Sequence, residues 1–190
     1  MLNKHRVTKI KNILTVIASF ILSALLIKHA IAKSEFIFDV ILSISVLFIF
    51  YKFYDKLHQD NLSYSSLLFT LVLHNLGLYA SSPLGVRFDH YMHFVGGFAI
   101  AIIFDRFLKE SMSKSKRFAL VIIFALGIGA IGEIIEWAGY GILGNGGGFL
   151  FYGTGDEGEW NNSIKDLIFN SLGAVAFAAS TLFRKGYTNK

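Results

Sequence analysis

Residues 118–140 read FALVIIFALGIGAIGEIIEWAGY, and Glu133 and Glu136 are the only charged residues in this run of 23. A membrane-spanning helix requires roughly 20 consecutive, predominantly apolar residues. The whole chain shares this character, because 54% of its 190 residues are hydrophobic, 16% are charged and the mean hydropathy is +0.54. Soluble domains contain about 25% charged residues. The sequence therefore excludes an ordinary water-soluble domain and predicts a protein embedded in a lipid bilayer.

Six apolar runs of suitable length follow one another, and no repeat of fixed period is visible. They predict a single-domain, all-α, polytopic membrane helix bundle over residues 1–190. The six transmembrane helices are expected at approximately 11–31, 36–54, 64–80, 89–108, 118–140 and 164–183, the third being the shortest. The first run has a second interpretation, because its basic start and the small residues Ala30 and Ala32 also resemble a cleavable secretory signal.

The basic residues predict how the bundle is oriented. In this arrangement 14 lysine and arginine residues fall on one side and 4 on the other. Cytoplasmic loops retain basic residues, so both termini are expected in the cytoplasm and the loops beginning at Ala32, Ser81 and Gly141 outside it. The expected location is the plasma membrane or a bacterial inner membrane, with the lipid bilayer as partner. Orientation also accounts for the net charge of +5, so no nucleic-acid partner is expected.

Polar residues gather at the non-cytoplasmic ends of the last three spans. Each span contributes a pair on one helix face: Asp89 and His93, Glu133 and Glu136, Asp166 and Asn170. By helical rise, His93, Glu133 and Asn170 lie roughly 6–11 Å inside the outer boundary. Deeper still, each helix carries a glycine that is expected to allow close helix packing, namely Gly97, Gly129 and Gly173.

This polar cluster predicts a divalent metal site. An unpaired carboxylate inside an apolar helix costs a few kcal/mol on insertion scales, so Glu133 requires a proton, a basic side chain or a cation. Carboxylate, imidazole and amide groups form a hard ligand set that suits Mg²⁺, Mn²⁺, Ca²⁺ or Zn²⁺, and the chain has no cysteine. The candidate ligands are Asp89, His93, Glu133, Glu136 and Asp166, and the catalytic candidates are Glu133, Glu136 and Asn170.

Structural interpretations of the same residues stay open. Asp89 and Asp166 lie near helix starts, where a carboxylate commonly caps the helix or favours its dipole. His93 taken alone is more often an interior, hydrogen-bonded histidine than a ligand.

Four further residues are weaker candidates for contacts with a substrate or lid. They are Arg87 as an anion contact, His74 on the third span, Trp137 as a pocket wall or interfacial aromatic residue, and Asp156. Asp156 belongs to the glycine-rich external loop 141–163, which is either a lid or a flexible connector. His90 is expected at the interface, and His29 is expected to have no specific role.

Three motifs together resemble one protein family. They are Asp89-x-x-x-His93-x-x-x-Gly97, Gly132-Glu133-Ile134-Ile135-Glu136-Trp137 and, after Asp156, Asp166-Leu167-Ile168-Phe169-Asn170-Ser171-Leu172-Gly173. Over roughly residues 60–183 the chain resembles the YjdF-like family of small bacterial inner-membrane proteins and, more loosely, VanZ-like membrane proteins. The resemblance implies that these residues lie on successive helices, and it implies no particular reaction.

Three functions remain open at this point. The leading hypothesis is a metal-dependent hydrolase acting on a lipid or lipid-linked head group, because the site opens at the interface where such substrates lie. The second is a cation or proton transporter or channel, although the inner halves of the last three spans show no matching acid. The third is a non-enzymatic assembly or sensor protein whose polar cluster only holds helices together.

Overall fold

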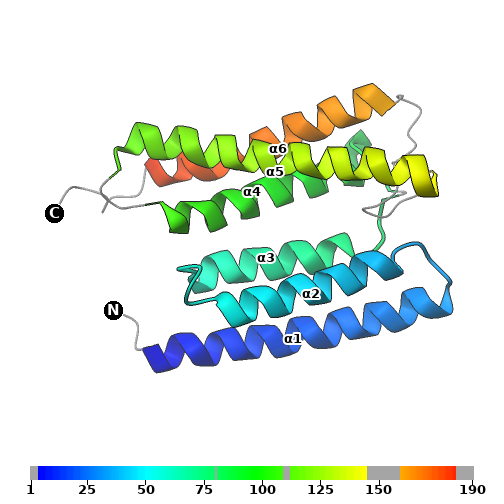
Figure 1. Cartoon of the computed structure of the whole chain (residues 1–190), viewed down its shortest axis with the longest axis horizontal. Helices are drawn as coiled ribbons and strands as arrows, with labels where there is room; N and C mark the ends of the chain where they lie inside the picture. The colour runs from blue at the N-terminus through cyan, green and yellow to red at the C-terminus, as the bar shows by residue number, and fades with distance from the viewer. Residues whose placement is uncertain (1–3, 80, 109–111, 145–158, 183–190) are drawn as a thin grey trace.

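The computed structural model describes residues 4–79, 81–108, 112–144 and 159–182, and the regular secondary structure in this part of the chain is all helical. It contains six α-helices and one short 3₁₀ turn, which run up and down in chain order (Figure 1). The elements are α1 (Lys4–Ile31), α2 (Ile37–Phe53), α3 (Asn61–His74), η1 (Pro83–Gly85), α4 (Phe88–Phe107), α5 (Lys114–Leu143) and α6 (Glu159–Leu182). The predicted all-α class and the order of the six helices are confirmed for these residues.

The third helix differs most from its predicted boundaries. It begins at Asn61 because Asp60 and Ser63 form a capping box, in which the Ser63 backbone N–H donates to Asp60 Oδ1 at 2.9 Å. It ends at His74, six residues earlier than predicted, and Gly77 then adopts a φ of 70°. A glycine with positive φ favours a turn over continued helix. Residues 75–79 therefore leave the helix and form a separate connection towards η1.

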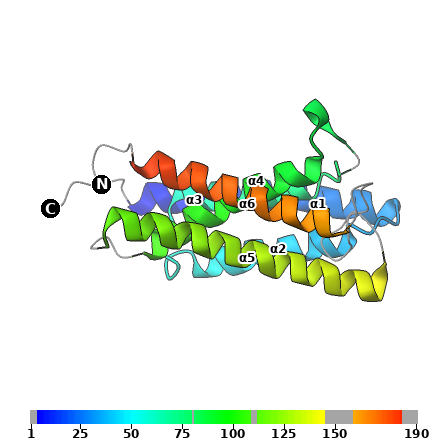
Figure 2. The ribbon, with the colours of Figure 1, turned by 90° about the horizontal axis from the view of Figure 1, so that it is seen from above.

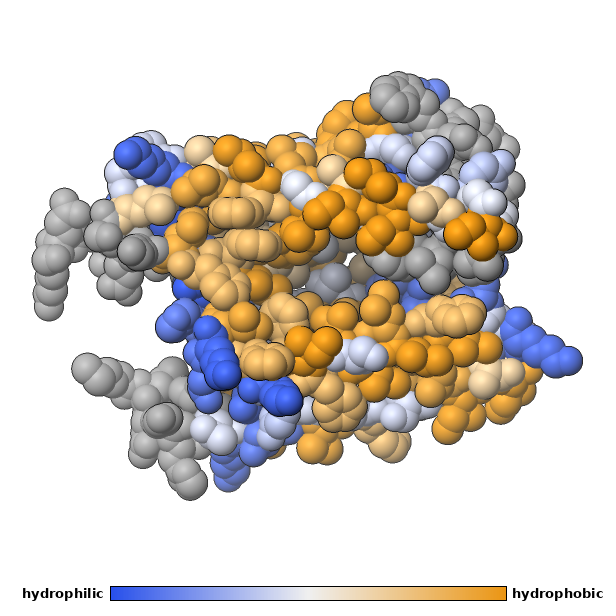
Figure 3. All heavy atoms as spheres, viewed as in Figure 1, coloured by the Kyte–Doolittle hydropathy of each residue, from blue (hydrophilic) through white to orange (hydrophobic). Residues whose placement is uncertain are grey.

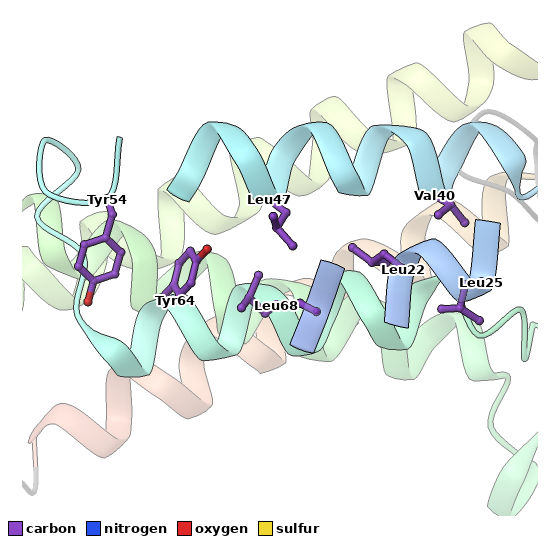
Figure 4. Packing of buried hydrophobic residues seen from close by; sticks show 8 residues of the cluster. Leu22, Leu25, Val40, Leu47, Tyr54, Tyr64 and Leu68 are labelled. Atoms are coloured by element: carbon purple, nitrogen blue, oxygen red, sulfur yellow. The ribbon is translucent and has the colours of Figure 1, made fainter. Parts of the chain in front are cut away.

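The six helices form two groups of three, α1–α3 and α4–α6, which meet where α3 packs on α4 (Figures 1 and 2). The first group has its own apolar core, in which Leu22 of α1, Val40 and Leu47 of α2 and Leu68 of α3 converge (Figure 4). The second group packs through small and apolar residues: Ala101, Ile102, Val121, Ala125, Ala174, Phe177 and Ala178. Each group thus has a core of its own.

The surface around the helices is strongly apolar. Figure 3 shows hydrophobic residues over most of the visible face, with hydrophilic residues towards the ends of the helices. Phe20, Ile31 and Ile134 are 76%, 80% and 63% exposed. Residues Thr8–Ile31 and Lys114–Ile142 are each long and apolar enough to cross a membrane, yet only 22% and 17% of their most apolar windows are buried. A core helix of a soluble protein would be mostly buried, so this surface fits contact with lipid.

Helices α4 and α6 approach each other at two glycines. A Cβ atom at Gly97 would overlap the carbonyl oxygen of Asn170, and one at Gly173 would overlap the carbonyl oxygen of Phe94. On α5, a Cβ atom at Gly129 would lie 2.5 Å from Asn170 Nδ2. The expectation that these three glycines allow close helix packing is confirmed.

The packing predicts opposite effects of alanine at two adjacent positions. Gly97→Ala should lower the unfolding free energy by about 1–3 kcal/mol because the added methyl group forces α4 away from α6. A Cβ atom at Gly96 meets no heavy atom within 4 Å, so Gly96→Ala should be neutral or stabilise by up to about 1 kcal/mol through helix propensity. Equilibrium unfolding in mixed detergent micelles measures both variants, and equal effects would contradict the packing.

Candidate functional site

Three carboxylates from three helices converge on one imidazole nitrogen. His93 Nε2 on α4 lies 3.6 Å from Asp89 Oδ1, 3.8 Å from Glu133 Oε1 on α5 and 3.6 Å from Asp166 Oδ1 on α6. Its other nitrogen, Nδ1, lies 3.1 Å from Asn170 Nδ2. The structure therefore brings together five of the residues singled out in the sequence.

Asp166 is the most deeply buried acid of this cluster, with no exposed surface. His90 Nδ1 lies 2.7 Å from its Oδ1, and Asn162 Nδ2 donates to its Oδ2 at 2.7 Å. Arg87 in turn donates a hydrogen bond to the Asn162 side-chain oxygen. The sequence placed Asp166 near the start of its helix, which is wrong because α6 begins at Glu159 and puts Asp166 about two turns inside the helix.

His90 was expected at the membrane interface, and this expectation is also wrong. The side chain is 4% exposed and its ring stacks on Phe169, with centroids 5.2 Å apart. The reason is that α4 packs very closely on α6, so that α6 also covers the face of α4 that carries His90. The sequence contained a signal for this contact, because Asn162 and Asp166 are four residues apart and therefore lie on one face of α6, the face that covers His90.

Glu133 has the least compensated charge of the group. The residue is 7% exposed, and neither carboxylate oxygen has a hydrogen-bond partner among the described residues. A buried carboxylate of this kind is costly unless a proton or cation accompanies it. Its surroundings therefore fit a cation better than they fit a structural hydrogen bond.

The buried acids and histidines form two groups whose ligand atoms lie within 4.8 Å of one another. One group contains Asp89, His90 and Asp166, and the other contains His93, Glu133 and Asp166. Asp166 belongs to both. These are donor atoms that a hard divalent cation accepts, so the residues fit the expected ion, and its presence stays a prediction.

The remaining sequence candidates lie outside these two groups. Glu136 is partly buried one turn beyond Glu133 and interacts electrostatically with Glu133, Asp89 and Asp166. Trp137 is 65% exposed, in agreement with the interfacial interpretation. Asp156 and most of the glycine-rich loop lie outside the described residues.

A second polar group lies in the first three helices and contains His74. His74 Nε2 lies 3.6 Å from Asp39 Oδ2 on α2, and the Tyr79 hydroxyl lies 2.5 Å from His74 Nδ1. The sequence predicted a contribution from His74 but missed Asp39 and Tyr79. An aspartate inside the otherwise apolar run 36–54 was the available signal.

His29 was expected to have no specific role, which is wrong. It is 4% exposed, and its Nε2 lies 3.0 Å from the carbonyl oxygen of Asn75. The Asn75 amide donates to Ser43 Oγ at 2.7 Å. These contacts connect α1, α2 and the end of α3.

The opposite end of the bundle contains a buried acid that the sequence analysis overlooked. Asp105 is 3% exposed, and Arg117 donates to its Oδ1 at 2.5 Å and to its carbonyl oxygen at 2.6 Å. Arg106 lies 3.4 Å from Asp105 Oδ2 and 2.8 Å from Asp60 Oδ2. The expectation of no acid in the inner halves is corrected, because Asp105 is present and ion-paired.

The fold and the site define a class of protein: a helix bundle with a lipid-compatible surface and a buried acid–histidine cluster. Residues 10–186 match the model of a family described as "Predicted membrane protein (DUF2238)". The chain therefore belongs to this family of membrane proteins. No curated protein and no solved structure matches the chain. The membrane class is thus confirmed, whereas the YjdF-like and VanZ-like resemblances stay predictions.

The contacts of Asp166 predict a graded effect of substitution. Asp166→Leu removes the acceptor that His90 and Asn162 share and should cost about 1–3 kcal/mol for each lost hydrogen bond. Asp166→Asn retains one carbonyl oxygen and should cost less. Unfolding of both variants in the presence of a chelator measures the effect without a bound ion. Equal stability of the leucine variant and the wild type would contradict the buried network.

Proposed function

We propose that all six helices cross the membrane, with both termini in the cytoplasm and the acid–histidine cluster near the non-cytoplasmic surface. The proposal is supported by the alternation of the helices, since α1 begins and α6 ends at the same end of the bundle (Figure 1). Basic residues are concentrated at that end. The apolar surface between the two ends supplies the contact with lipid.

The absence of cysteine from the chain allows a direct test of orientation. Leu84, which is 98% exposed in η1, should react as Leu84→Cys with a membrane-impermeant maleimide added to intact cells. The exposed Lys56, on the opposite side, should react as Lys56→Cys only after the cells are permeabilised. The reverse pattern, or equal labelling, would overturn the proposed topology.

We further propose that the cluster binds a divalent cation between α4, α5 and α6. The observation that carries this proposal is the pair of unpartnered, buried oxygens of Glu133, which lie beside His93 and Asp166. A neutral His93 that bound a cation through Nε2 would carry its proton on Nδ1. Turning the Asn170 amide over would then present its oxygen to this proton, an arrangement that commonly orients histidine ligands.

Measurement of bound metal tests the cation site. Purified wild-type protein in lipid nanodiscs should contain a stoichiometric divalent ion, and Glu133→Gln should lower the affinity at least about tenfold. Asp55→Asn removes an exposed carboxylate elsewhere and should leave the affinity unchanged. Wild-type protein without metal, after equilibration with Mg²⁺, Mn²⁺, Ca²⁺ and Zn²⁺ in turn, would sink the proposal.

The function that this arrangement supports best is hydrolysis of a lipid or lipid-linked phosphate at the outer leaflet. A divalent ion bound there would polarise a phosphoryl oxygen and lower the pKa of a water molecule. Arg87 lies at the rim, where its guanidinium can contact an anion. Glu136, one turn nearer the surface than Glu133, is placed to exchange protons with solvent.

An apolar groove supports a substrate with a hydrocarbon chain. It has a volume of about 260 Å³ and lies between α3 and α4, lined by Phe69 and Thr70 on one side and Phe94 and Phe98 on the other. Phe94 directly follows His93 on α4, so the same helix contributes to the groove and to the cluster. The hydrocarbon chain of a lipid is the occupant that suits an apolar lining in a membrane protein.

A defined probe tests hydrolysis. Wild-type protein in mixed micelles should release p-nitrophenol from a long-chain alkyl p-nitrophenyl phosphodiester when Mn²⁺ is present, and Glu133→Gln should abolish most of this activity. Asp55→Asn is again the matched control. Transport and a purely structural cluster are less well supported, because the inner acid Asp105 is ion-paired and the Glu133 oxygens are unpartnered. Failure to cleave phosphomonoester, phosphodiester and pyrophosphate probes with any of the four ions would overturn the hydrolase proposal.

A further inference from the structure

Three side chains of the first helix group form a connected chain at the same end of the molecule as the acid–histidine cluster. Asp39 lies in the first turn of α2, His74 is the last residue of α3, and Tyr79 follows it in the connection to η1. Asp39 Oδ2 and His74 Nε2 are 3.6 Å apart, and His74 Nδ1 and the Tyr79 hydroxyl are 2.5 Å apart. A hydroxyl, a base and a carboxylate that orients the base constitute a recognised catalytic pattern.

The order of the three groups fixes the direction of proton transfer. A carboxylate beside Nε2 favours the tautomer in which Nε2 carries the proton. Nδ1 of His74 then presents its lone pair to the Tyr79 hydroxyl, which donates to it. The Asp39–His74 distance is longer than a formed hydrogen bond, as is common before a substrate is bound. In His74, Nε2 therefore carries the proton and Nδ1 carries the lone pair.

Tyr79 lies where the two helix groups meet. Its ring packs edge-on against Phe88, with centroids 5.6 Å apart, and Phe88 immediately precedes Asp89. The backbone N–H of Phe88 donates to the carbonyl of Ser81 at 3.0 Å, which fixes this connection against the start of α4. These contacts hold Tyr79 against the start of α4, which carries Asp89.

Asp39 adds a buried negative charge where neutral groups already join the helices. The contacts of His29, Asn75 and Ser43 connect α1, α2 and the end of α3. A carboxylate that is 3% exposed carries a desolvation cost. In the first turn of α2 its charge favours the helix dipole, and beside His74 it can also stabilise a positive imidazolium.

We propose that Tyr79, His74 and Asp39 form a general-base relay for the phosphate hydrolysis assigned above to the acid–histidine cluster, on which this inference rests. As the oxygen of a water molecule attacks phosphorus, one of its O–H bonds breaks and the proton passes to the Tyr79 oxygen. The Tyr79 proton passes at the same time to His74 Nδ1. The P–O bond to the leaving group breaks, the leaving oxygen takes a proton from solvent, and His74 returns its proton to solvent.

In this relay Tyr79 contacts the reacting water, whereas His74 and Asp39 act through Tyr79. Tyr79 never accumulates as a phenolate, because it gives its proton to His74 Nδ1 while it accepts one from the water. Asp39 is a positioning residue that holds the tautomer and compensates the imidazolium. The relay also explains why His74 ends a helix of the first group and yet serves a site in the second.

The test compares three relay variants with one matched control. Tyr79→Phe removes only the hydroxyl, His74→Gln removes the base and Asp39→Asn removes the charge. His29→Gln is the control, since His29 is a buried histidine of the same helix group whose Nε2 meets a backbone carbonyl. Each variant is assayed for bound Mn²⁺, unfolding free energy and cleavage of the long-chain alkyl p-nitrophenyl phosphodiester.

The expected result is that the relay variants retain bound Mn²⁺ while kcat falls about 100-fold, a usual contribution of a general base. KM should change little, because the relay acts only in the transition state. The control should keep the wild-type kcat. In ¹⁵N-histidine-labelled protein, the Nδ1 resonance of His74 is assigned as the one that disappears in His74→Gln. Tyr79→Phe should shift this resonance.

Two outcomes overturn the relay and leave the proposed function standing. One is a kcat for Tyr79→Phe and Asp39→Asn that equals that of His29→Gln while Mn²⁺ binding and cleavage persist. The other is a His74 Nδ1 resonance that Tyr79→Phe does not alter. Wild-type protein that binds no metal and cleaves no probe overturns the proposed function instead, so the two failures are distinguishable.

Discussion

The backbones of α4 and α6 touch at Gly97 and Gly173, and this contact sets the geometry of the polar groups above it. Two helices with side chains at these positions would lie farther apart, and His90 and His93 would not reach Asp166. The third helix depends on the same arrangement, because Gly129 of α5 makes room for Asn170. Close packing through small residues is a general device of membrane helices. In this protein it also assembles a site.

The two ends of the second helix group handle buried negative charge in different ways. At one end, Asp105 is paired with Arg117 and Arg106, so its charge is compensated by residues of the chain itself. At the opposite end, Asp89, Glu133 and Asp166 surround the imidazole of His93, and Asp166 also pairs with His90. A buried pair needs matched charge to repay its desolvation. Two guanidinium groups compensate Asp105, whereas the three acids of the cluster lie around histidines. This contrast singles out the acid–histidine cluster as the functional candidate.

Much of this arrangement could be predicted from the sequence, because bilayer thickness and helical periodicity act on single helices. The all-α class, the helix order, the stripes that carry His93, Glu133 and Asn170, and the three glycines all follow from such local rules. The burial of His90 and Asp166 could not be predicted in the same way. It depends on where α6 begins and on how closely two helices pack, and neither is encoded within one helix.

The early end of α3 has a physical consequence for the site. Its 14 residues span about 21 Å, which is shorter than the roughly 30 Å hydrocarbon core. If α3 crosses the bilayer as proposed, part of the connection that follows it lies at membrane depth without helical hydrogen bonds. Such backbone is stable only where it is buried in protein or lines a water-filled cavity.

Part of the backbone of this connection is satisfied by its own hydrogen bonds. Leu76 N–H donates to the carbonyl of Leu73, Ser81 N–H to that of Leu78, and Phe88 N–H to that of Ser81. It also carries Tyr79 to the boundary between the two helix groups. A short helix followed by irregular backbone is thus the feature that brings the Tyr79 ring against Phe88, the residue that precedes Asp89 of the acid–histidine cluster.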